Sequence, residues 1–160
     1  MSRSTVRAAV SSWFAPPNVA GLNTVYTAKP KIIPAVDFRR GQPAGTRTGV
    51  VGVVSITYEQ EQRVALGGAS SGWKMVAYSV EFQLYCHSVQ PKAEDAQDDF
   101  DTTVDGIAAR LRADRTLGGA VWEAAEDLLE VEFGEPAVIS GSATERWAAV
   151  RFIVIDMVQA

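Results

Sequence analysis

The sequence predicts a single α+β domain over residues 1–160, in which one long amphipathic helix and a short N-terminal helix pack on a mainly antiparallel sheet. Residues 91–119 have the apolar spacing of a long helix, and residues 50–87 have the period-two alternation of a long β-hairpin. No repeat, low-complexity tract or linker divides the chain. Because the expected strands and helices do not alternate regularly, α+β is the economical class.

The N-terminal part is expected to hold a short helix and an edge strand. Ser4 is the expected N-cap, a Pro-Pro pair at 16–17 ends the helix, and its apolar side carries Val6, Val10, Trp13 and Phe14. Residues 22–27 have an extended pattern and are followed by prolines, which lack a ladder donor, so we predict an edge strand or an arm there. The glycine-rich residues 39–49 are expected to form an exposed loop.

Residues 50–66 and 73–87 are the clearest strands. In the first, Val54, Ile56 and Tyr58 are expected on one face and Ser55, Thr57 and Glu59 on the other. In the second, the expected buried face consists of Val76, Tyr78, Val80, Phe82, Leu84 and Cys86. Residues 67–72, Gly-Gly-Ala-Ser-Ser-Gly, have the composition of the reversal that joins the two strands.

One face of the long helix is predicted to be buried, because its apolar residues recur at helical spacing: Phe100, Val104, Ile107, Ala108 and Leu111. Carboxylates crowd the first half, whereas Arg110, Arg112 and Arg115 lie in the second half, an order that complements the helix dipole. The acidic run therefore has a structural explanation. Residues 115–119, Arg-Thr-Leu-Gly-Gly, are expected to end the helix.

The C-terminal third is expected to add two strands. Residues 120–127 are compatible with a short helix or an irregular crossing, and residues 129–133 then alternate apolar side chains with glutamates as a strand would. Residues 134–142 are expected to form a connection. Residues 146–158 carry apolar side chains on both parities, which predicts a strand that is covered on both faces at the centre of the sheet.

Composition and charge exclude several classes of protein. The 47% hydrophobic content is globular, and the net charge of −4 argues against a protein that grips the phosphate backbone of nucleic acid. The single cysteine, Cys86, cannot form an internal disulfide, which fits a reducing cytoplasm. We expect no membrane span and no signal peptide, because no apolar run has the required length or continuity.

No catalytic residue, cofactor or metal site is expected. His87 is the only histidine and follows Cys86 directly, so on a strand the two side chains point to opposite faces and cannot pair. One cysteine and one histidine cannot supply a structural zinc site. The carboxylates at 98–101 lack the spacing of a calcium loop, and the glycines at 41–52 lack the Gly-Lys-Ser/Thr ending of a phosphate-binding loop.

Tryptophan is enriched both in cores and at interfaces, so each one needs its own interpretation. Trp122 and Trp147 lie in patterned segments and are expected in the core. Trp73 follows Gly72 at the end of the hairpin, where burial within one small domain is difficult. We therefore expect Trp73 to contact a partner.

The residues around the end of the long helix resemble those of tail terminator (tail completion) proteins of long-tailed bacteriophages, especially actinobacterial siphophages. The likeness is carried by residues 100–111, Asp114-Arg115-Thr116-Leu117-Gly118-Gly119, Val121-Trp122 and the apolar strand 148–158. The opening helix 6–14, followed by Asn23-Thr24-Val25-Tyr26 and a proline, adds to it, so that the resemblance covers most of the chain.

This resemblance implies a non-enzymatic virion protein, without a cofactor, that is assembled in the host cytoplasm. It would form a hexameric ring on the head-proximal end of the tail tube, halt tube growth and offer a docking surface to the head. The implied partners are copies of itself, the tail tube protein and a head-to-tail connector or stopper protein, while genomic DNA passes through the channel without specific binding. At −4 per copy the ring would carry roughly −24, which repels DNA in transit.

Head-to-tail contacts close into rings when the rotation is right, and sheet edges can pair between neighbours. We therefore expect the hairpin and the 39–49 loop to make most of the contacts, with Arg47, Arg63, Trp73 and Lys74 as candidate interface residues. Deletion of residues 67–72 should leave a folded monomer that does not assemble. Two alternatives stay open: another neck, head-to-tail connector or minor tail protein, and, from a different class, a cellular α+β domain that binds a small ligand.

Overall fold

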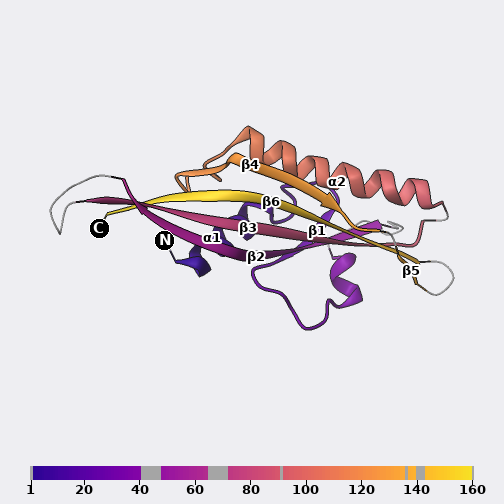
Figure 1. Cartoon of the computed structure of the whole chain (residues 1–160). Helices are drawn as coiled ribbons and strands as arrows, with labels where there is room; N and C mark the ends of the chain where they lie inside the picture. Colours follow the sequence, from indigo (N-terminus) through magenta and orange to yellow (C-terminus); the bar gives the residue numbers. More distant parts are fainter. Residues whose placement is uncertain are drawn as a thin grey trace.

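The computed structural model describes residues 2–40, 48–64, 72–90, 92–135, 137–139 and 143–159. Within these ranges it has the predicted α+β architecture, with a long helix and a short N-terminal helix packed on a mostly antiparallel sheet (Figure 1). The elements are α1 (Arg3–Phe14), β1 (Leu22–Tyr26), the 3-10 turn η1 (Ala35–Phe38), β2 (Thr48–Arg63), β3 (Trp73–Ser88), α2 (Ala93–Ala113), β4 (Glu123–Phe133), β5 (Ala137–Ile139) and β6 (Ala143–Gln159).

The strand order is β1-β2-β3-β6-β4, and β5 also pairs with β6. β1 runs parallel to β2, whereas the other pairs are antiparallel. The predicted edge strand at 22–27 is thus confirmed, and so is the central position of the strand at 146–158. The long β2–β3 hairpin pairs from Thr48 opposite Ser88 to Arg63 opposite Lys74.

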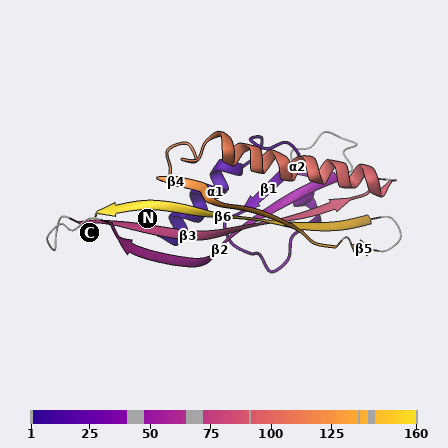
Figure 2. The same ribbon diagram turned by 45° about the horizontal axis from the view of Figure 1, so that its top comes forward.

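Both helices contribute to one buried cluster on a single face of the sheet (Figure 2). The rings of Phe14 in α1 and Phe82 in β3 are stacked, with centroids 4.9 Å apart. Arg110 in α2 lies 4.0 Å from the centroid of the Trp13 ring, and its Nε donates to the Trp13 carbonyl over 3.0 Å. The two helices are therefore fastened to each other as well as to the sheet.

The long helix buries the predicted side chains: Phe100, Val104, Ile107, Ala108 and Leu111. It has acidic residues in its first turn and Arg110 and Arg112 in its last turn, as the dipole favours. Asp114 then accepts hydrogen bonds from the backbone N–H groups of Thr116 (2.8 Å) and Gly118 (3.0 Å). Gly118 and Gly119 have φ angles of 72° and 82°, so the glycines at the predicted end of the helix permit the reversal.

Three N-terminal predictions need correction or completion. The N-cap of α1 is Ser2, whose Oγ accepts from the Thr5 N–H over 3.3 Å, and not Ser4. β2 begins at Thr48, so residues 48 and 49 belong to the strand and not to the predicted loop. Strand pairing with β3 explains this early start. The other residues of that loop at 41–47, and the predicted reversal at 67–71, lie outside the described residues.

A register shift in β2 overturns one face assignment. Ile56 lies opposite Val80, but Tyr58 lies opposite Ser79, because the pairing shifts between these two positions. One extra residue in a strand reverses the alternation beyond it. Tyr58 therefore does not share the face of Val54 and Ile56 as predicted, and its side chain is exposed.

The C-terminal third differs from prediction at two places. The ambiguous residues 120–127 form a short turn and then the start of β4, with an irregularity between Ala124 and Leu129. The predicted connection at 134–142 contains the three-residue strand β5. The alternating strand at 129–133 is confirmed as the second half of β4.

Candidate functional site

The face of the sheet opposite the helices is largely uncovered. Figure 1 places only the segment around η1 on that side, where it packs on β2 and where Val51 and Val53 are buried. The rest of this surface, which we call the open face, is formed by alternate residues of the two central strands: Met75, Ala77, Ser79, Glu81, Gln83 and Tyr85 of β3, and Trp147, Ala149, Arg151, Ile153, Ile155 and Met157 of β6.

The prediction that β6 is covered on both faces is therefore wrong, because helices cover only one of them. Trp147 illustrates the consequence: it lies opposite Tyr85 on the open face, and 40% of it is exposed. Trp122, in the turn before β4, is also exposed, while its backbone N–H donates to the Ile155 carbonyl over 3.1 Å. Neither tryptophan is a core residue as expected.

A charged cluster crosses the middle of the open face. The Arg151 guanidinium lies 2.9 Å from Glu81, 2.6 Å from Glu132 and 3.6 Å from Glu130. The hydrogen bond from Arg151 is the largest cause that lowers the pKa of the Glu81 carboxyl below its usual value. With three carboxylates around one cation, this part of the face is acidic.

Beyond this cluster the open face becomes an apolar strip. Ile153, Ile155 and Met157 of β6 lie opposite Ser79, Ala77 and Met75 of β3. The register shift in β2 adds Tyr58 beside Ser79, and 62% of Tyr58 is exposed. We use "apolar strip" for Tyr58, Met75, Ala77, Ile153, Ile155 and Met157.

The strip leads to an end of the sheet that extends past the helices (Figure 1). β3 has 16 residues and so spans about 50 Å, whereas the 21 residues of α2 span about 30 Å. The helix cannot cover the whole strand for this reason. We call the three-stranded projection of β2, β3 and β6 the arm.

Three of the four predicted interface residues meet at the end of the arm. Trp73 lies opposite Gln159 and is 46% exposed, while Arg63 lies opposite Lys74. Lys74 Nζ pairs with Glu61 at 2.6 Å, and Arg63 forms no ion pair within the described part of the chain. We refer to Arg63, Trp73 and Lys74 as the arm tip. The fourth predicted residue, Arg47, lies outside the described residues.

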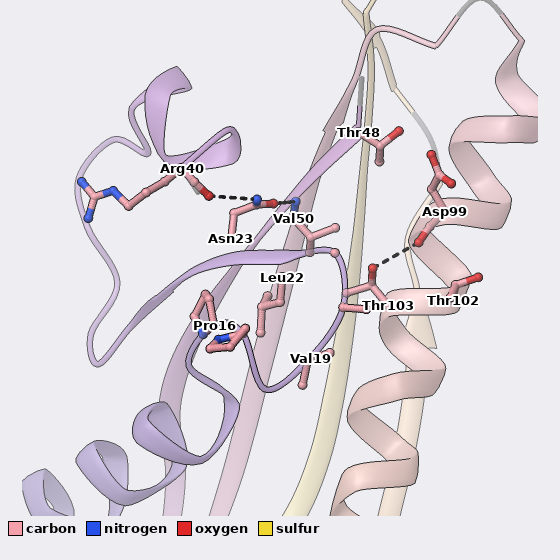
Figure 3. A pocket seen from close by; sticks show the side chains of 13 residues that line it. Pro16, Val19, Leu22, Asn23, Arg40, Thr48, Val50, Asp99, Thr102 and Thr103 are labelled. Atoms are coloured by element: carbon pink, nitrogen blue, oxygen red, sulfur yellow. Dashed lines mark hydrogen bonds between the residues drawn. The ribbon is translucent and has the colours of Figure 1, made fainter. Parts of the chain in front are cut away.

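A pocket of about 480 Å³ lies between the segment after α1, the start of β2 and the first half of α2 (Figure 3). Pro16, Val19, Leu22 and Val50 supply apolar walls. The polar lining is mostly engaged: the buried Asn23 donates to the Arg40 carbonyl over 3.2 Å and accepts from the Val50 N–H over 2.9 Å. The pocket therefore suits an apolar group with a polar rim.

The rim of this pocket belongs to α2 and to the end of the η1 segment. Thr102, Thr103 and the exposed Asp99 come from α2, and Asp99 accepts a hydrogen bond from Gln90 over 3.1 Å. Arg40 lines the opposite side and pairs with Asp37 at 3.1 Å. Sequence reasoning missed this pocket, since its walls come from segments far apart in the chain.

Cys86 and His87 do not form a catalytic pair. Cys86 is buried on the helix-covered face, and burial raises the pKa of its thiol to about 12. His87 lies on the other face, with its ring centroid 5.8 Å from that of Phe38. Among the residues that the structure describes, no group of at least three His, Cys, Asp or Glu side chains is placed to hold a metal ion.

No helix in the described ranges is long and apolar enough to cross a membrane. The features that remain for a functional argument are the apolar strip, the arm tip and the pocket. Neither a protein-family model nor a curated protein matches this chain.

Proposed function

We propose that this chain is a structural virion subunit that forms a homohexameric ring on the head-proximal end of a bacteriophage tail tube. The ring ends tube polymerisation and provides the surface on which the head or neck docks. The proposal assigns no enzymatic activity. The observation that carries it is the arm, which presents an exposed aromatic and basic tip next to an uncovered apolar strip.

Self-association gives such a surface a physical purpose. Monomeric proteins rarely leave a large contiguous apolar patch in water, and such patches commonly mark protein contacts. The strip combines aliphatic, methionine and tyrosine side chains, the types that are enriched at interface cores. Its acidic neighbour around Arg151 supplies a polar rim, and rims of this kind surround the buried part of most interfaces.

The partners of the proposed ring are further copies of the chain, the tail tube protein and a head-to-tail connector or stopper protein. With −4 per copy, a hexamer carries roughly −24. Such a ring repels the DNA that passes through its channel and so does not hold it.

A second candidate, a domain that binds a small ligand, is favoured by the pocket alone. A volume of about 480 Å³ falls within the usual ~300–1,000 Å³ of ligand sites. The ring is the better-supported function because the most deeply buried polar group of the pocket, Asn23, already has backbone partners. Saturable binding of a small metabolite by the isolated monomer would favour the second candidate.

The test is the length of tail tubes grown from purified tube protein in the presence of this chain, measured by electron microscopy. The wild-type chain is expected to cap one end and give a narrow distribution of lengths. Ile155→Glu, which places a charge in the apolar strip, should abolish capping, whereas Ile32→Glu changes an exposed isoleucine elsewhere and should not. Tubes that grow equally long with and without the wild-type chain would refute the proposal.

A further inference from the structure

We propose that the arm tip of one copy docks in the pocket and on the acidic first half of α2 of a second copy. The inference rests on the proposed ring and names the contact that would close it. The occupant of the pocket is thus neither a metabolite nor an unrelated protein but another molecule of this chain.

The arm tip has the chemistry of an interface anchor. Trp73 is a large aromatic side chain with 46% of its surface exposed, and tryptophan and arginine are the residue types most enriched among interface hot spots. Arg63 is exposed and makes no ion pair within the described residues, and Lys74 shares its charge with Glu61. The tip therefore offers one apolar knob and a surplus of positive charge.

The first half of α2 offers the opposite charge. It carries six carboxylates, and none of them forms an ion pair within the described part of the chain. They are Glu94, Asp95, Asp98, Asp99, Asp101 and Asp105. Each of these groups is exposed or half-buried, so that a basic partner can reach them.

The pocket lies directly beside these carboxylates, because Asp99 and Thr102 form part of its lining. Its apolar walls and volume of about 480 Å³ accommodate an indole ring. Figure 3 shows Asp99 and Thr102 on the helix across from Pro16 and Leu22. An indole in the pocket would therefore bring the adjacent Lys74 and the cross-strand Arg63 to the acidic helix.

The tip cannot reach the pocket of its own molecule. Val50, in the pocket wall, and Arg63, in the tip, lie on the same straight strand, about 40 Å apart at ~3.3 Å per residue. Two complementary surfaces that are fixed far apart on one molecule make heterologous contacts, which close into a ring when the rotation permits. The arrangement thus points to a head-to-tail assembly.

Charge exchange tests the contact. In the presence of tube ends, Arg63→Glu combined with Lys74→Glu should weaken assembly at least about tenfold, and Asp98→Lys combined with Asp99→Lys should do the same. Combining all four substitutions in one chain should restore assembly to within a few fold of wild type, since attraction returns with reversed sign. Arg112→Glu, at the other end of α2, is the matched control and should have little effect.

Disulfide trapping tests the same contact by distance. In a Cys86→Ala background, Gln62→Cys at the arm and Thr102→Cys at the pocket rim should form, on oxidation, a covalent ladder that ends at the closed ring. Gln62→Cys with Arg112→Cys should form no ladder. Circular dichroism confirms that each variant is folded.

The two levels of the proposal fail in different ways. If the wild-type chain forms rings on tubes, but charge exchange does not rescue assembly and no Gln62–Thr102 ladder appears, this contact is wrong and the ring remains. If the wild-type chain forms no ring and caps no tube, the proposed function is wrong. Rescue together with the ladder establishes the contact.

Discussion

Cys86 is the residue whose chemistry is most clearly fixed by its surroundings. It is buried in the centre of β3, and burial raises the pKa of its thiol to about 12. Because the thiolate is the reactive form, we predict that native protein does not react with a disulfide reagent at pH 8, whereas unfolded protein reacts fully. Absorbance of the released thiol measures this, and Cys86→Ala with Gln62→Cys is the exposed control. Fast labelling of the native thiol would contradict the burial of Cys86.

Arg151 offers a second prediction at the residue scale. Its hydrogen bond lowers the pKa of Glu81 in the folded protein, so this carboxylate contributes stability above its unfolded pKa of about 4.5 and loses it as the pH falls through the folded value. Arg151→Met removes the interaction. Urea unfolding at several pH values should then show a shallower loss of stability on acidification than in wild type.

The control for this prediction is Arg115→Met, which breaks an exposed pair with Glu126. Exposed pairs contribute little, so the pH dependence should hardly change. Equal effects of the two substitutions would show that Arg151 is not special in holding the Glu81 carboxylate.

Single residues also show where sequence reasoning reaches its limit. Burial of Phe82, Cys86 and Phe100 follows from spacing alone, because each lies in a long regular element. The exposure of Tyr58 does not, since one extra residue in β2 reverses the alternation and no local signal marks it. Trp147 was misplaced because an apolar residue in a strand does not reveal whether a second layer covers it.

At the scale of the elements, two glycines make a matched prediction. A Cβ at Gly52 in β2 would lie 2.4 Å from the ring of Phe82, which is itself stacked on Phe14 of α1. Gly52→Ala should therefore destabilise the protein by about 1–3 kcal/mol through overpacking between α1 and the sheet. Chemical denaturation measures the change.

Gly106→Ala is the control, since a Cβ there meets only a Val19 methyl at 3.4 Å in the middle of α2. Alanine in a helix interior is favoured over glycine, so stability should rise by about 0.5–1 kcal/mol. The pair should thus have opposite signs. A neutral Gly52→Ala would mean that α1 does not press Phe82 against β2.

Long elements were predictable and short ones were not. The hairpin and α2 extend over enough residues for their periodicity to identify them. β5 has three residues, too few for any period, and it exists because β6 provides a pairing edge. The start of β4 was ambiguous because its register with β6 is interrupted between Ala124 and Leu129.

At the scale of the whole molecule, sequence reasoning located the arm tip but missed the pocket. Trp73 was expected at an exposed strand end because no segment beyond it could cover it. The pocket is assembled from residues 16–23, 48–50 and 99–103, which only the tertiary fold brings together. The open face likewise results from both helices choosing the same side of the sheet.

The long sheet, with cover on one face only, makes an assembly prediction of its own. Trp73→Ala should remove the anchor of the arm while leaving the fold intact, because nearly half of the side chain is exposed. Thermal unfolding should change little, whereas the amount of chain retained on tube ends should fall by about tenfold or more. Trp122→Ala, at another exposed tryptophan, serves as the comparison and should retain normal binding.

Head-to-tail self-association on a tube end is most directly tested by the mass and symmetry of the chain bound there. Tube ends capped with the purified chain are imaged by cryo-electron microscopy, and the capping complex is released for native mass measurement. We predict a closed hexameric ring at one end of each tube, in which the arm of every subunit reaches its neighbour. Single subunits scattered along the tubes, or a protein that stays monomeric and leaves tube ends bare, would contradict it.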